Sequence, residues 1–322
     1  MEVVEVLRRC GGSADARDVL AHVSRRDLAR AAECGAVVRV RRGRYALPEL
    51  PAPRVAAERA SGAASGLSAA QLWGLPVLLP PSRASVTVRP NAHPAADRSV
   101  AVHYAQLAPE EVRGRVTSPL RTVLDCSAWL PFREGLAVAD SALRLGAVSE
   151  QELRQAADVR TGPGSVQARK VAAHADGRAA NPFESAVRGT LVQNGLTGFE
   201  PQVWVELADG TSIRVDLADE ELCMIGEADS FAWHGDRRAL ASDCRRYDEA
   251  VRTGRTVLRV AWEQAMFEEE WLGRLFLDVA EQQRAVQEVR RRLAQPGRSR
   301  RGRGSSPSVP EQRAGPRTAP AT

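Results

Sequence analysis

Breaks rich in proline and glycine divide this 322-residue chain into separate folding units. A short segment, residues 1–48, ends at a proline, and a region of mixed helix and strand patterns follows over residues 54–178. A third unit covers residues 180–295, and the remaining tail, 296–322, is rich in Arg, Ser, Pro and Gly. Such a tail buries too little apolar surface to fold, so we expect it to be disordered. This division predicts an α+β protein of several domains.

Charge is distributed unevenly between these units. The tail holds six arginines and one glutamate, which equals the net charge of +5, so the rest of the chain sums to zero. Within that remainder, residues 24–47 carry seven arginines against two acids, whereas residues 180–295 carry fourteen arginines against twenty-one acids. A basic front end therefore precedes an acidic rear domain, and this polarity favours different roles for the two ends.

Apolar content and cysteine spacing bear on the compartment. No run of eighteen apolar residues is present and the first residues lack the layout of a signal peptide, so we expect a cytoplasmic protein with no membrane contact. The cysteines lie far apart without a Cys-x-x-Cys pair, which argues against a thiolate zinc site or a disulfide framework. We expect small buried side chains in a reducing compartment. The five are Cys10, Cys34, Cys126, Cys223 and Cys244.

The N-terminal segment predicts a winged helix-turn-helix. Apolar spacing indicates helices over residues 3–7 and 15–22, and a third that begins after the N-cap Ser24 and runs to Cys34. Residues 37–47 then alternate apolar and basic side chains around Arg-Gly, which is typical of a β-hairpin. Three short helices followed by a hairpin is the winged-helix order.

Arginines on this segment predict contact with DNA. A recognition helix presents its first residues to base edges in the major groove, while hairpin arginines bind flanking phosphates. The alternative is a protein-binding winged helix whose arginines only keep it in solution. The candidate DNA-binding residues are Arg25, Arg26 and Arg30 on the helix and Arg39, Arg41, Arg42 and Arg44 on the hairpin.

The middle region offers elements without a chemical constellation. Ser118 and Pro119 are typical of an N-cap followed by proline at the first helical position. Arg121 and Asp125 stand four apart, so we expect them to pair on the helix surface. We interpret the region as a scaffold or a partner-binding unit. The expected elements are a helix near 68–73, strands 85–88 and 100–104, and helices 121–128, 133–144 and 149–157.

The rear domain places acids on neighbouring strands. Asp216 ends one predicted strand and Glu227 lies on the next, with a polar turn between them. Antiparallel pairing would bring these carboxylates within a residue pair or two of each other, although the register is open. Glu227 and Asp229 are two apart and project from one face. Like charges crowded on an apolar face cost stability unless a cation compensates, and Mg²⁺ or Mn²⁺ prefers such oxygen ligands. A bound ion of this kind promotes phosphodiester hydrolysis.

These residues resemble the restriction-endonuclease-like PD-(D/E)xK superfamily, and more closely its very-short-patch-repair-like branch, common in actinobacteria as domains of unknown function. The resemblance covers residues 181–270 and implies a C-terminal restriction-endonuclease-like α/β domain. It implies that Glu184, Asp216 and Glu227 hold the metal, that Asp216, Glu227, Asp229 and His234 are catalytic, and that Asp243 and Arg246 support them.

The chain departs from the superfamily at one position. The usual lysine, two residues after the glutamate, is Asp229 here, and the only lysine is Lys170. In the resembling branch a histidine is thought to serve instead, which gives His234 the role of general acid/base or water-positioning group. If His234 points elsewhere, the domain binds DNA without cutting it.

Each of these residues also has a plainer interpretation. Glu184 follows Asn181 by three residues and fits a capping box. Asp216 at a strand end could simply start a turn, and His234 beside a tryptophan could be an ordinary packed histidine. The helical pair Asp243 and Arg246 most often forms a surface ion pair.

The front half resembles the N-terminal domain of AbiEi-type antitoxins of type IV toxin–antitoxin systems. The matching stretch is residues 12–48, including Ser24-Arg25-Arg26-Asp27-Leu28 and the hairpin. The middle region, with Leu67–Ala70 and Val116–Thr122, resembles the segment next to that domain in similar actinobacterial chains. The resemblance implies operator binding, autoregulation at its own promoter and a cognate toxin as partner. Two functions therefore stay open: a magnesium-dependent DNA endonuclease, or an antitoxin-like regulator with a catalytically silent rear domain.

Overall fold

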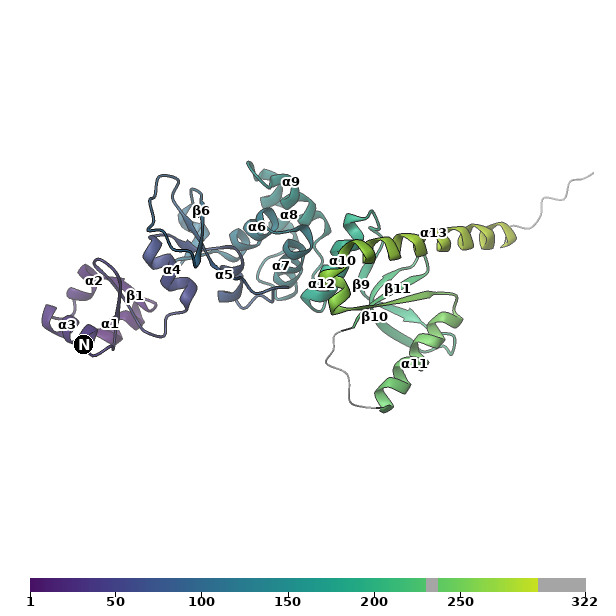
Figure 1. Cartoon of the computed structure of the whole chain (residues 1–322), viewed down its shortest axis with the longest axis horizontal. Helices are drawn as coiled ribbons and strands as arrows, with labels where there is room; N and C mark the ends of the chain where they lie inside the picture. Colours follow the sequence, from purple (N-terminus) through teal and green to yellow (C-terminus); the bar gives the residue numbers. More distant parts are fainter. Residues whose placement is uncertain (230–236, 295–322) are drawn as a thin grey trace, which may run out of the picture.

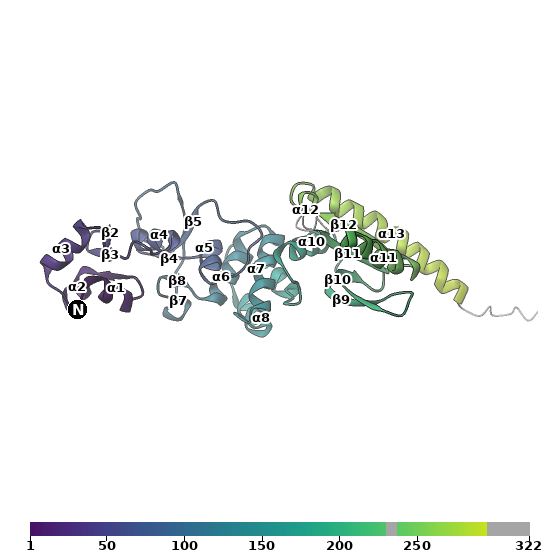
Figure 2. The ribbon, with the colours of Figure 1, turned by 90° about the horizontal axis from the view of Figure 1, so that it is seen from below.

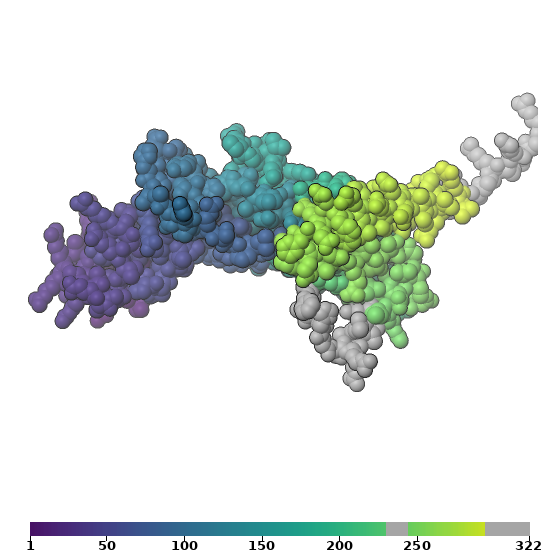
Figure 3. All heavy atoms as spheres, viewed as in Figure 1, coloured from purple at the N-terminus to yellow at the C-terminus, as the bar shows by residue number. Residues whose placement is uncertain are grey.

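The computed structural model describes residues 1–229 and 237–294. The described chain forms thirteen α-helices and three β-sheets, which confirms a mixed α+β protein of several units. The units follow one another along an elongated molecule, with the N-terminus at one end and helix α13 (Glu269–Ala294) reaching toward the other (Figure 1). The space-filling view shows the same linear order (Figure 3).

The first unit contains three short helices and a three-stranded antiparallel sheet of order β1-β3-β2. The predicted third helix begins where Ser24 and Asp27 form a reciprocal capping box. Its apolar face packs with Leu7, Val19 and Val37 into a small core. The hairpin was predicted, whereas strand β1 was missed because Ser13-Ala14-Asp15 contains a single apolar residue and shows no alternation. The elements are α1 Val3–Arg9, β1 Ser13–Asp15, α2 Ala16–Leu20, α3 Arg25–Glu33, β2 Val38–Arg41 and β3 Arg44–Ala46.

A buried carboxylate attaches this hairpin to the next helix. Glu58 of helix α4 (Ala52–Ala60) has no exposed surface and pairs with Arg44 at 2.8 Å and with Arg115 at 3.1 Å. Arg41 donates from Nε to the Glu58 carbonyl oxygen at 3.0 Å. Buried charged contacts around Glu58 therefore hold the hairpin against the middle region.

The middle region comprises a five-stranded sheet followed by a helical cluster. The sheet has the order β6-β5-β4-β8-β7, and α4 and α5 pack on it through small alanine side chains. As predicted, Ser118 caps α6 and Pro119 is its first residue. The elements are α4 Ala52–Ala60, β4 Ala63–Ala64, α5 Gly66–Leu72, β5 Ala84–Val88, β6 Val100–Tyr104, a 3₁₀ turn Pro109–Glu111, β7 Val112–Arg113, β8 Val116–Thr117, α6 Pro119–Trp129, α7 Phe132–Arg144, α8 Glu150–Val159 and α9 Ser165–His174.

The expected surface pair on α6 is an interior one. Arg121 and Asp125 do pair, at 2.9 Å, but the Asp125 side chain is fully buried. Arg160 also lies 3.5 Å from Asp125, and Glu111 lies 2.9 Å from Arg121. The prediction of a surface contact was wrong because α8 and the 3₁₀ turn cover this face of the helix.

The rear unit is a four-stranded sheet with helices on both faces. Its order is β12-β11-β10-β9, with β11 and β12 parallel and the other pairs antiparallel. Leu217 and Met224 pack against α10 and α13 on one face, whereas Ile225 packs against Ala250 of α11 on the other. The elements are α10 Pro182–Gln193, β9 Glu200–Glu206, β10 Ser212–Asp219, β11 Met224–Asp229, α11 Arg237–Arg252, β12 Thr256–Ala261, α12 Trp262–Phe267 and α13 Glu269–Ala294.

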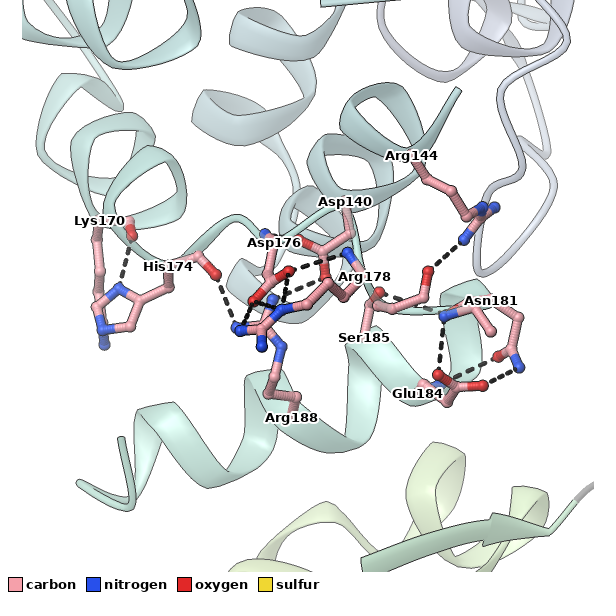
Figure 4. A network of polar contacts seen from close by, with 12 residues as sticks. Asp140, Arg144, Lys170, His174, Asp176, Arg178, Asn181, Glu184, Ser185 and Arg188 are labelled. Carbon is pink, nitrogen blue, oxygen red and sulfur yellow. Dashed lines mark hydrogen bonds and ion pairs between the residues drawn. The ribbon is translucent and has the colours of Figure 1, made fainter. Parts of the chain in front are cut away.

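Helix α10 belongs to the packing of both the middle helices and the rear sheet. Its Arg188 pairs with Asp140 of α7 at 2.8 Å, and both side chains are buried (Figure 4). Arg188 also donates to the His174 carbonyl oxygen at 2.7 Å. A second link runs from Arg133 of α7 to the backbone carbonyl of Ala265 in α12. The rear sheet is therefore fixed to the middle helices rather than suspended on a linker.

The structure bears on two expectations from composition, the absence of a membrane-spanning helix and the state of the cysteines. None of the helices in the described ranges combines the length and the apolar character needed to cross a bilayer. All five thiols are free, as expected, but only Cys126 is buried. The expectation of burial was wrong for the other four, which are exposed or half-buried.

Candidate functional site

The candidate site lies where the sheet ladder is interrupted. The predicted antiparallel pairing is confirmed, with Leu217 opposite Gly226 as its last pair. Asp216 and Glu227 follow directly beyond this pair, and the Ala228 backbone donates to Asp216 Oδ2 at 2.9 Å. Within the described strands, Asp216 is the one residue of β10 that pairs with neither neighbour, and Gln202 is the one unpaired residue of β9. Because these two positions leave the ladder, their side chains are available to the site rather than to regular sheet packing.

Glu184 joins the site from the first turn of α10. Asn181 accepts from the backbone of Phe183 and Glu184, and its amide donates to Glu184 Oε1 at 2.7 Å (Figure 4). The Ala180 backbone donates to Glu184 Oε2 at 2.8 Å. Asn181 therefore caps the helix, but the reciprocal bond of a capping box is replaced, because the Glu184 carboxyl accepts from the Ala180 backbone and the Asn181 side chain. The same Oε2 accepts from Gln202 at 2.9 Å, so the capping carboxylate also faces the sheet.

Asp216 stands between the two glutamates. Its Oδ1 accepts from Gln202 Nε2 at 3.3 Å, and its Oδ2 accepts from the Ala228 backbone at 2.9 Å. These contacts link β10 to β9 on one side and to β11 on the other. Asp216 is thus not merely the start of a turn, because both of its oxygens bind neighbouring strands.

Glu227 is the least satisfied acid of the group. It is 5% exposed, and its Oε1 has no hydrogen-bond partner among the residues that the structure describes. The guanidinium of Arg246 lies close by, with Nη2 3.8 Å from this oxygen. Burial, followed by the charge of Asp216, raises the pKa of Glu227 to about 8. The same two causes raise the pKa of Glu184 to about 7, so both glutamates retain protons near neutral pH unless a cation is bound.

Asp229 has a cationic partner of its own. It pairs with Arg259 of β12 at 2.6 Å, and both side chains are partly exposed. The structure therefore brings together Glu184, Asp216 and Glu227. The fourth predicted acid, Asp229, forms an ion pair with Arg259 instead. His234 lies outside the described residues, as does the side chain of Asp243.

Three contributors were not predicted from the sequence: Gln202, Tyr247 and Arg259. The Tyr247 hydroxyl accepts from Arg246 at 2.7 Å, and the guanidinium groups of Arg246 and Arg259 lie 4.8 and 4.9 Å from its ring centroid. Burial and the nearby Glu227 raise the pKa of Tyr247. Arg259 could have been identified from the sequence, because it is a charged residue within the apolar strand Thr256–Ala261. No feature of the sequence marked Gln202.

The donor chemistry of the site fits a hard divalent cation. Glu227, Asp216 and Glu184 would supply ligands for Mg²⁺ or Mn²⁺. The observation that favours such an ion is the Glu227 oxygen, which accepts no hydrogen bond from the described residues. Among the described residues, however, no three acid, histidine or cysteine side chains already stand in metal-binding geometry. Ligation therefore requires some rearrangement of these side chains.

The predicted DNA-binding arginines divide into two groups. Five are exposed on α3 and the hairpin. Arg44 is instead directed to Glu58 and to Asp15, at 2.8 and 3.2 Å, and Arg41 lies 3.7 Å from Asp15. Their charges are largely compensated within the protein. The exposed five are Arg25, Arg26, Arg30, Arg39 and Arg42.

Comparison with known proteins gives relatives without an assigned activity. No protein-family model matches the chain. Two uncharacterized proteins of Mycobacterium tuberculosis, MT2308 of strain CDC 1551 and Rv2248 of strain H37Rv, are each 30% identical to it over 153 residues. The match covers 47% of this chain and 56% of each relative. The crystal structure of the RV2827C protein from Mycobacterium tuberculosis aligns with a TM-score of 0.32 and 16% identity, over 57% of this chain and 78% of that one. This similarity is too low to define a fold.

Proposed function

We propose that the rear unit is a restriction-endonuclease-like, metal-dependent phosphodiesterase that cuts DNA, and that the first unit is a winged helix that brings it there. The observation that carries the proposal is Glu227, a buried carboxyl beside Asp216 with one oxygen that accepts no hydrogen bond from the residues that the structure describes. A structural acid at this depth would be expected to have its own hydrogen-bond donors. Action on DNA would place the protein in the cytoplasm.

The residues of the site have separable tasks in this proposal. Glu227, Asp216 and Glu184, once deprotonated, would hold the divalent ion. A bound ion of this kind polarises a phosphate and lowers the pKa of water. Arg246, 3.8 Å from Glu227, provides positive charge near the carboxylates where a phosphate would bind. His234 is proposed as the proton-transfer group in place of the usual lysine.

Plasmid cleavage tests this function. The wild-type chain and Glu227→Gln, which keeps the shape of the side chain, would be incubated with supercoiled DNA and Mg²⁺ or Mn²⁺. Glu206→Gln removes an exposed acid of the same sheet and is the matched control. We expect nicking by the wild type and the control but not by Glu227→Gln. Equal nicking by all three proteins would assign the activity to contamination.

We propose a second function because of one specific observation. Asp229 occupies the position of the usual lysine and is paired with Arg259, which favours a rear domain without catalysis. The chain would then be an antitoxin-like regulator that binds its own promoter, with a toxin as partner. The double variant Arg25→Ala, Arg26→Ala should lose promoter binding, whereas Arg154→Ala, exposed in the middle region, should not. Unchanged affinity of the double variant would argue against this function.

A further inference from the structure

The backbone of Gln202 adopts a conformation that its residue type disfavours. Its φ is +57°, in the left-handed region that costs energy for a residue with a Cβ atom, and it lies inside strand β9. Strain of this kind persists only where surrounding contacts impose it, and it often marks functional positions. Regular pairing resumes on both sides, at Pro201 and Val203. The distortion is therefore confined to the one residue that faces the carboxylates.

The side chain of Gln202 explains what this distortion achieves. Its amide nitrogen lies 2.9 Å from Glu184 Oε2 and 3.3 Å from Asp216 Oδ1, so one amide group donates to two carboxyl groups. The two acids come from different elements, α10 and β10, and otherwise repel each other. An amide is suited to this position because it is a double hydrogen-bond donor without a charge that would exclude a cation.

We infer that Gln202 is a positioning residue that holds Glu184 and Asp216 toward each other before any ion arrives. Asp216 in turn accepts from the Ala228 backbone, so its orientation is transmitted to β11 beside Glu227. Gln202 then acts through the carboxylates and does not itself contact substrate. This inference rests on the proposed metal site for its function, but the positioning it describes exists in the metal-free protein.

Substitutions at this position separate the amide from the backbone strain. Gln202→Asn keeps an amide on a residue type that tolerates left-handed backbone, but its side chain is one methylene shorter and does not reach both acids. Gln202→Gly relieves the strain and removes the amide altogether. Gln283→Asn, on α13, shortens a glutamine of the same unit that donates to Thr256, and is the matched control.

Amide hydrogen exchange of the metal-free full chain is the first measurement. In Gln202→Asn and Gln202→Gly the Ala228 amide should exchange faster because Asp216 is no longer held as its acceptor. The exchange rate of the Ile225 amide on the same strand should be unchanged. A general loss of stability would instead raise the exchange rates of both amides. Unchanged Ala228 exchange in both variants would overturn the inference.

Calorimetric titration with Mn²⁺ is the second measurement. Loss of a group that orients metal ligands typically weakens binding by about 10- to 100-fold, and we expect both Gln202 variants to fall in this range while Gln283→Asn binds as the wild type does. Wild-type affinity in both variants would also overturn the inference. If the wild-type chain binds no Mn²⁺, the proposed metal-dependent function fails, whereas the exchange of Ala228 still decides whether Gln202 positions Asp216.

Discussion

At the scale of single residues, the site depends on a carboxyl group that is more stable protonated than charged. Burial and Asp216 raise the pKa of Glu227 to about 8, far above the ordinary glutamate value of 4.5. A folded-state pKa above the unfolded one means that the folded protein binds more protons, so this group's stabilising contribution is complete below pH 4.5 and is lost as pH rises toward 8. The metal-free protein should therefore weaken across this window.

Thermal unfolding in a chelator tests this titration. Between about pH 5 and pH 8.5 the wild type should lose on the order of a few kcal/mol of unfolding free energy, because each pKa unit corresponds to about 1.4 kcal/mol. Glu227→Gln cannot ionise and should lose less. Glu206→Gln, which removes an exposed acid, should follow the wild type. Parallel pH curves for Glu227→Gln and the wild type would contradict the shifted pKa.

The same pKa values predict how the proposed metal binding responds to pH. Glu184 and Glu227 must each release a proton before they ligate, and their pKa values are raised to about 7 and about 8. Mn²⁺ affinity should therefore rise by about tenfold or more from pH 6 to pH 8, with protons released on binding. Calorimetry in buffers of different ionisation enthalpy measures both quantities. An affinity independent of pH would show that these two carboxyls are not the ligands.

Sequence reasoning found the acids but not all of their partners. Asp216 and Glu227 were predicted to be neighbours because acids on two strands joined by a polar turn must approach under antiparallel pairing. The ion pair of Asp229 with Arg259 spans thirty residues and depends on the parallel pairing of β11 with β12, which periodicity does not define. Gln202 was missed because left-handed backbone inside a strand is imposed by tertiary contacts.

At the scale of elements, the hairpin shows the difference between predicting a strand and predicting its environment. Alternating residues correctly indicated β2 and β3, and arginine at the outward positions suggested a phosphate-binding surface. Arg44 instead pairs with the fully buried Glu58, since α4 packs directly against the hairpin. Alternation alone therefore does not show whether a charged side chain of a strand faces solvent, because another element of the fold can pack against that face.

Removing this carboxylate should loosen the first unit. Deleting one member of a buried ion pair typically costs about 3–5 kcal/mol. Glu58→Ala would remove the partner of Arg115 and would leave Arg44 with Asp15 alone, so we expect a loss toward the lower end of this range. Urea unfolding should show the loss, with the hairpin amides exchanging first. Glu49→Ala, at an exposed position nearby, provides the comparison. Wild-type stability of Glu58→Ala would mean that solvent already compensates these arginines.

At the scale of the whole molecule, the two proposed contacts with DNA lie far apart along the chain and in space. The first unit with its exposed arginines occupies one end, and the rear sheet with its carboxylates lies beyond the middle helices (Figure 2). Breaks in the sequence predicted a chain of several units. The sharing of α10 between the middle helices and the rear sheet was not, because the buried pair of Asp140 and Arg188 joins residues 48 positions apart.

This separation predicts that DNA binding and DNA cleavage respond to different variants. Each arginine that contacts a phosphate contributes about −0.9 to the slope of log affinity against log salt concentration, so Arg25→Ala, Arg26→Ala should weaken binding and flatten that slope by up to about 2. Glu227→Gln should leave both quantities unchanged and abolish nicking, because its carboxyl faces the proposed ion rather than the duplex. Fluorescence anisotropy over a range of salt concentrations, with Ca²⁺ in place of Mg²⁺, measures the binding. If Glu227→Gln lowered DNA affinity as much as the arginine variant does, the two ends would not act separately, and the front unit could no longer be regarded as the part that recruits the rear one.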